Sequence, residues 1–128
     1  MVDKQNAMKL LVDACPSFQK KYESYVEATY GSGQERLPYV DVGELTNHLD
    51  EMLHDGAVEE LTAVFRAIEV LHLQGDEYVR EFATIGVLEG IQNTAKDPAA
   101  FEPFLQEESK KWWIKLNEFW SGQTPLLK

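Results

Sequence analysis

The sequence predicts an all-α protein, an irregular bundle or short HEAT-like stack of about six or seven helices. Three observations favour this fold class. Apolar residues recur at intervals of three and four along most of the 128-residue chain, which is the period of an amphipathic helix. Glycine and proline separate these segments, as they do where helices begin and end. Only residues 34–40 leave room for a short strand, and none is predicted there.

The predicted helices follow one another with short breaks, so sequence neighbours are expected to pack antiparallel. They span residues 6–14, 18–30, 41–54, 57–74, 76–96, 98–105 and 107–121. Gly56 and Gly75 end two of them. One domain covering residues 1–128 accounts for this length, with residues 122–128 expected to form a frayed tail.

The first three helices carry the clearest local signals at their ends. Pro16 ends the first helix, Ser17 is expected to cap the second, and Asp41 is expected to open the third. Cys15 follows the apolar face of the first helix and is predicted to be a small core residue. His48 is predicted to lie on the outer face of the third helix.

Residues 76–96 form the stretch around which the chain is organised. Asp76 is suited to cap this helix, and residues 82–88 are apolar on nearly every side, which is typical of a buried helix. Small residues at spacings of three and four would let another helix approach closely; they are Ala83, Gly86 and Gly90. Deep burial is therefore predicted for Phe82, Gly86 and Leu88.

The last helix contains three tryptophans. Trp113, Leu116 and Trp120 are predicted to lie on one stripe. Trp112 and Trp113 are adjacent and cannot point in the same direction. Core packing of both is one interpretation, and a partly exposed tryptophan that binds a partner is the other.

Composition narrows the classes of function. The formal net charge is -10, which disfavours nucleic acid and anionic membranes as partners and favours a basic protein partner. No apolar run approaches the ~18 residues of a membrane span. Lys9 and Asp13 interrupt the apolar core that a signal peptide would need, and the single cysteine indicates no disulfide scaffold. Cytoplasm is therefore the expected location.

The chain carries no catalytic motif that we recognise: it has no nucleophile elbow, P-loop, dinucleotide-binding glycines or zinc-protease helix. Neither a catalytic residue nor a cofactor is predicted. A metal-binding helical bundle or an enzyme remains an alternative, because His48, Glu51 and Asp55 can share a helix face with Glu44 one turn away. A solvated helix face explains the same pattern, and no metal ligand is assigned.

Acidic residues are densest at the predicted turn between the third and fourth helices. A tight turn would bring these carboxylates onto one rim, where a basic partner meets its strongest attraction. The predicted partner-binding residues are Glu44, Asp50, Glu51, Asp55, Glu59 and Glu60. A solubilising surface with no partner is the alternative.

The run LQGDEYVREFATIGVLEGIQN and the later WWIKLNEFW resemble small all-helical bacterial proteins of toxin–immunity systems. The resemblance covers the second half of the chain. It implies a cytoplasmic, non-enzymatic protein that neutralises a cognate toxin by covering it, and it implies no catalytic residues. A helical adaptor or regulatory subunit for another protein partner is the alternative that these features support equally.

Overall fold

The computed structural model describes residues 1–122, and in these residues the protein is all-α, as predicted. The α-helices are α1 (Lys4–Asp13), α2 (Pro16–Tyr30), α3 (Pro38–Asp55), α4 (Val58–Gln74), α5 (Glu77–Glu81), α6 (Glu89–Thr94) and α7 (Glu107–Trp120). The π-helix η1 (Phe82–Leu88) joins α5 to α6, and the 3-10 helix η2 (Pro98–Phe104) precedes α7. Within residues 1–122, one isolated parallel bridge between Val2 and Gly75 is the only β-type pairing.

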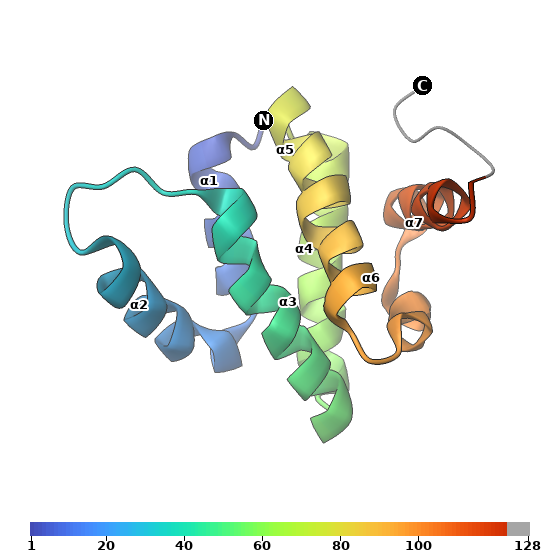
Figure 1. Cartoon of the computed structure of the whole chain (residues 1–128), viewed down its shortest axis with the longest axis horizontal. Coiled ribbons are helices and arrows are strands. Elements are labelled where there is room, and N and C mark those ends of the chain that lie inside the picture. The colour runs from blue at the N-terminus through green and yellow to red at the C-terminus, as the bar shows by residue number, and fades with distance from the viewer. Residues whose placement is uncertain (123–128) are drawn as a thin grey trace.

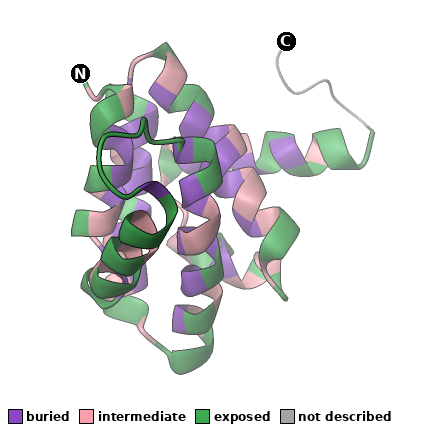
Figure 2. Ribbon diagram, turned by 60° about the vertical axis from the view of Figure 1, so that its left-hand side comes forward, coloured by how far each residue is buried: buried purple, intermediate pink, exposed green. Residues whose placement is uncertain are grey.

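The helices surround a core centred on α4, which packs against α1, α3, α5, η1, η2 and α7. In Figure 1, α1 and α2 lie on one side of this centre, and η2 and α7 lie on the other. Four fully buried phenylalanines come from four elements: Phe18, Phe65, Phe82 and Phe101. The residues of segment 31–37, by contrast, are all exposed, as Figure 2 shows. No helix in this described part is both long and apolar enough to cross a membrane.

Several helix ends form as their local sequence predicts. The side chain of Asp76 accepts a hydrogen bond from the Val79 N–H at 2.9 Å and caps α5. Gly56 ends α3 with φ of 77°, a left-handed conformation that glycine adopts without steric cost. Gly75 ends α4 with an extended backbone, and the position requires glycine because a Cβ there would overlap the Leu71 carbonyl oxygen and the Val79 side chain.

Helix α1 begins at Lys4, two residues before its predicted start, and the predicted capping or opening residue is wrong at the next two helices. Helix α2 begins at Pro16, and Ser17 does not cap it. Helix α3 begins at Pro38, three residues before Asp41, because proline has the φ of a first helical residue and needs no N–H partner there. The hydroxyl of Tyr30 also accepts from the Leu37 N–H at 3.1 Å, which fixes the chain just before the helix.

The central stretch is helical throughout 77–94, but its middle is the π-helix η1. Phe82, Gly86 and Leu88 are buried, as predicted. A Cβ on Gly86 would meet the Phe82 ring at 2.8 Å and the Tyr39 ring at 3.4 Å, and a Cβ on Gly90 would meet Thr46 at 3.3 Å. Gly90 therefore permits the close approach of α3 that the spacing predicts, whereas the space at Gly86 is limited mainly by Phe82 of the same helical stretch.

The tryptophans of α7 have three different environments. Trp113 is buried with 2 % of its surface exposed, Trp112 is half-buried, and Trp120 is 58 % exposed. The predicted apolar stripe therefore holds for Trp113 and Leu116 but not for Trp120, because α7 extends beyond the body of the molecule at its end (Figure 2). Of the predicted tail, residues 123–128 lie outside the described residues.

Candidate functional site

The predicted acidic residues fall in three places rather than on one rim. Asp50, Glu51 and Asp55 line a surface hollow at the end of α3. Glu59 and Glu60 line a separate hollow, together with Gly56, Ala57 and Val58. Glu44 lies farther back along α3, is half-buried and lines neither hollow. Three of the six carboxylates, all on α3, thus share one hollow, and the turn at Gly56 adds neither Glu59 nor Glu60 to it.

The hollow at the end of α3, which we call the acidic hollow, has a volume of about 420 Å³. It is lined by Asp50, Glu51, Leu53, His54, Asp55, Lys96 and Asp97. Within residues 1–122, the carboxylates of Asp50, Asp55 and Asp97 form no ion pair. The segment after α6 therefore adds one carboxylate, Asp97, and one ammonium group, Lys96, to the acidic end of α3.

Glu51 also contacts a polar group of residues on the side toward α2, namely Lys21, His48 and Ser17. Its carboxylate pairs with the Lys21 ammonium at 3.3 Å. Lys21 also donates to Nδ1 of His48 at 3.1 Å, and Nε2 of His48 lies 2.8 Å from the Ser17 hydroxyl. Because an ammonium group can only donate, Nδ1 accepts and Nε2 carries the proton of a neutral imidazole.

The prediction that His48 lies on the outer face is wrong. His48 is buried, because α2 covers the side of α3 that carries it. Phe18 of α2 packs against the imidazole, with 5.2 Å between the centres of the two rings. Burial and the neighbouring Lys21 lower its pKa from the ordinary value of 6.5. Both ring nitrogens are engaged, so His48 does not join Glu51 and Asp55 as a metal ligand. No group of three His, Cys, Asp or Glu side chains within residues 1–122 has the arrangement of a metal site.

Glu60 has a structural role that its sequence neighbours do not reveal. Its carboxylate accepts the Ser17 N–H at 2.7 Å, so α4 caps the start of α2. Burial opposes ionisation of this carboxyl, but the hydrogen bonds from the backbone and hydroxyl of Ser17 outweigh burial and hold its pKa below the usual value. Glu60 is therefore engaged within the protein, whereas Glu59 is exposed.

Two further carboxylates are buried, Asp41 and Glu69, and neither burial was predicted from the sequence. Asp41 on α3 accepts hydrogen bonds from the hydroxyls of Tyr25 and Tyr30 on α2. Glu69 on α4 accepts from the backbone of Glu108 and Ser109 on α7. An acidic residue on an otherwise apolar helix face is the one signal that could have indicated these positions.

His72 extends the Glu69 network toward the π-helix. Its Nδ1 lies 3.0 Å from the Ser109 hydroxyl, and its Nε2 lies 3.2 Å from the Thr84 hydroxyl. Ser109 donates its only hydroxyl proton to Glu69 at 2.8 Å, so His72 must donate from Nδ1. Each polar group in this network has a partner on another helix, which makes it a connection between α4, η1 and α7.

Together these features define an acidic helical protein with an open carboxylate-lined hollow and several internal polar connections. The chain belongs to the family described as Domain of unknown function (DUF7674), whose model matches residues 8–121. No match was found among curated proteins or among solved structures.

Proposed function

We propose that the protein is a non-enzymatic binding protein that recognises a basic protein partner through the acidic hollow. The observation that carries the proposal is the set of carboxylates there, Asp50, Asp55 and Asp97, which form no ion pair within residues 1–122 although Lys96 lines the same hollow. Carboxylates without partners attract cationic side chains, speed association and select against acidic partners. We propose the cytoplasm as the location of this binding protein.

The specific form that we propose is an immunity protein that neutralises a cognate bacterial toxin by covering it. The net charge of -10 supports a basic partner such as a nuclease, and the resemblance of residues 73–93 and 112–120 to immunity proteins supports the toxin. A helical adaptor or regulatory subunit is the alternative. The exposed apolar side chains of Ile114, Phe119 and Trp120 on α7 favour this alternative, because they offer a second surface that a protein partner could contact.

The test begins with capture of a partner from the native host on the immobilised full chain, followed by measurement of association rates with the purified partner. The double variant Asp55→Lys and Asp97→Lys is expected to slow association and to make the rate less sensitive to salt. Neither side chain makes a hydrogen bond or an ion pair with residues 1–122, so folding should hardly change.

The matched control is Glu23→Lys with Glu27→Lys, which changes the net charge equally on the exposed face of α2. If both double variants slow association to the same extent, the association rate depends on the net charge of the protein rather than on the acidic hollow. If neither has an effect at low salt, the acidic hollow is not the interface, and α7 is the next surface to test. Loss of the partner's toxic activity on binding separates an immunity protein from an adaptor.

A further inference from the structure

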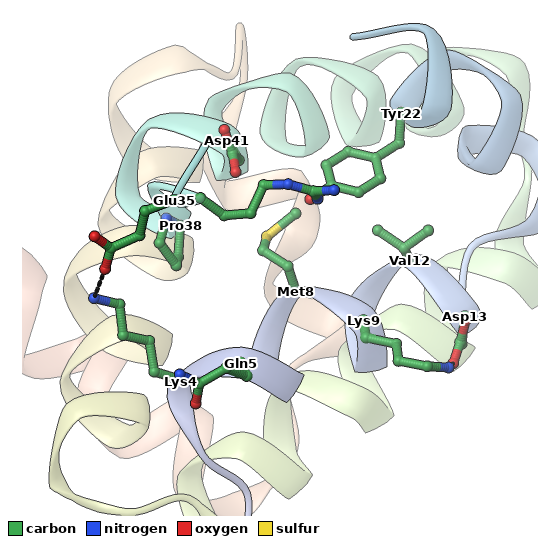
Figure 3. A pocket seen from close by; sticks show the side chains of 11 residues that line it. Lys4, Gln5, Met8, Lys9, Val12, Asp13, Tyr22, Glu35, Pro38 and Asp41 are labelled. Carbon is green, nitrogen blue, oxygen red and sulfur yellow. Dashed lines mark hydrogen bonds and ion pairs between the residues drawn. The ribbon is translucent and has the colours of Figure 1, made fainter. Parts of the chain in front are cut away.

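A second cavity lies on the opposite part of the molecule, between α1 and the start of α3. Figure 3 shows Met8 and Val12 rising from α1, with Pro38 and Tyr22 across from them. These four side chains give the cavity apolar walls. Its volume is about 370 Å³, near the lower end of the ~300–1,000 Å³ typical of small-molecule sites. A ligand of amino-acid size fits this space.

Most charged residues around the cavity are paired with one another. Lys4 and Glu35 form an ion pair at 3.6 Å, which is drawn in Figure 3. Lys9 and Asp13 form another at 2.8 Å. Two charged residues of the lining remain, Arg36 and Asp41, and neither forms an ion pair within residues 1–122.

Asp41 supplies a buried acceptor atom that has no donor. Its side chain is 0 % exposed, and its Oδ1 accepts the hydroxyls of Tyr25 and Tyr30. Its Oδ2 has no hydrogen-bond partner within residues 1–122. A buried carboxylate oxygen without a donor is costly, so a ligand that brings a donor to Oδ2 removes this cost on binding.

Arg36 lies near the same end of the cavity. Its guanidinium carbon is 5.5 Å from the centre of the Tyr30 ring, and the Tyr30 hydroxyl donates to Asp41. The phenol of Tyr22 is influenced by both charges: burial and Asp41 raise its pKa, while Arg36 lowers it. One cationic and one anionic group, each next to Tyr22 and Tyr30, thus line the cavity beside its apolar walls.

We propose that this cavity binds a small zwitterion of amino-acid size with an apolar side chain. The ligand's ammonium group donates to Oδ2 of Asp41, its carboxylate accepts from the guanidinium of Arg36, and its side chain contacts Met8 and Val12. A simple anion would leave Oδ2 of Asp41 without a donor, and a simple cation would leave Arg36 without an acceptor. The zwitterion satisfies both groups, and this binding is independent of the acidic hollow.

The first arm of the test varies the probe. Binding of L-leucine, L-leucinamide and 4-methylpentanoate to the full chain is measured by NMR titration, with the resonances of Met8, Val12 and Tyr22 as reporters. Leucinamide lacks the carboxylate and 4-methylpentanoate lacks the ammonium group. Because a charged hydrogen bond is lost in each case, both are expected to bind about tenfold or more weakly than leucine.

The second arm varies the protein. Asp41→Asn keeps the size of the side chain and removes its charge, so it should weaken leucine and leucinamide about tenfold but leave 4-methylpentanoate unchanged. Arg36→Gln should produce the opposite pattern, weakening leucine and 4-methylpentanoate. Arg66→Gln, an exposed arginine of α4, is the control and should change none of the three.

Three results would overturn the proposal: no saturable binding of any probe at millimolar concentration, equal affinity for all three probes, or unchanged leucine binding in either Asp41→Asn or Arg36→Gln. A circular dichroism melt shows whether Asp41→Asn is folded, since Tyr25 and Tyr30 also depend on this residue. If it is not folded, Arg36→Gln and the probe series decide the question alone.

Discussion

The carboxylate of Glu69 on α4 accepts both the backbone N–H of Ser109 at 2.9 Å and the Ser109 hydroxyl at 2.8 Å. Its other oxygen accepts the Glu108 N–H at 2.8 Å. These N–H groups belong to the first turn of α7 and have no acceptor within that helix. Glu69 therefore caps a helix that begins nearly forty residues later, and it fixes α7 to the core.

Replacement of this cap should be costly. Glu69→Ala leaves buried donors on α7 without an acceptor and removes a charged hydrogen-bonding group, so the free energy of unfolding should fall by about 2–3 kcal/mol. Urea unfolding followed by far-ultraviolet circular dichroism measures the change. Glu59→Ala on the same helix is the control, since Glu59 is exposed; an equal loss in both variants would contradict the capping role.

Protonation of His72 should destabilise the protein as the pH falls. Burial lowers the pKa of His72 below its ordinary value of 6.5, despite the opposing effect of Glu69. The unfolded chain therefore binds the proton more readily, and the stability that the neutral imidazole contributes is present above pH 6.5 and is lost below it. The lowered pKa values of Glu60 and Glu69 add a further loss at more acidic pH.

The free energy of unfolding, measured by urea titration from pH 8 to pH 5, checks this dependence. His72→Gln should reduce its slope near pH 6, and His48, whose pKa is also lowered, should supply the slope that remains. A wild-type stability that does not change between pH 8 and pH 5 would contradict the prediction.

The contact between η1 and α3 predicts opposite effects at two helical glycines. A Cβ at Gly86 would meet Phe82 and Tyr39, so Gly86→Leu should destabilise by about 1–3 kcal/mol through overpacking. Gly43 lies in α3, and a Cβ there would meet no atom within 4 Å. Gly43→Ala should therefore stabilise by about 0.5–1 kcal/mol, since alanine favours a helix. Thermal melts measure both changes, and a Gly86→Leu variant that melts no lower than the wild type would rule out tight packing at this position.

Cys15 should be an unreactive thiol in the folded protein. It is fully buried, its sulfur contacts that of Met52 at 3.5 Å, and burial together with Glu60 raises its pKa to about 12. The thiolate is the reactive form, so labelling with a thiol reagent at pH 8 should be slow in buffer and fast in denaturant. Rapid stoichiometric labelling of the native chain would show that this prediction is wrong.

The elements that could be predicted from sequence depend on interactions between near neighbours. Asp76 reaches a backbone N–H three residues ahead, and the conformation of Gly56 depends on its own lack of a side chain. The burial of Phe82 and Leu88 follows from an apolar run that no exposed helix would carry. The prediction that Ser17 caps α2 was wrong, because the carboxylate that accepts a hydrogen bond at the start of this helix belongs to Glu60, which lies 43 positions away in the sequence.

The candidate site was predictable only in part for a related reason. The density of carboxylates near Gly56 marks the end of α3, and Asp50, Glu51 and Asp55 do share a hollow. Sequence spacing does not show that Asp97 returns to that hollow or that Glu60 faces α2. These positions depend on how the loops after α3 and α6 fold back.

By itself, the sequence determined the all-α class, most of the helix ends and the acidic character of the surface, because each depends on composition or on residues within about one helical turn. Only the tertiary structure decided that Asp41, Glu60 and Glu69 are internal acceptors while Asp55 and Asp97 face the solvent. The physical reason is that a carboxylate's role depends on the nearest donor in space, and here those donors lie on helices distant in the chain.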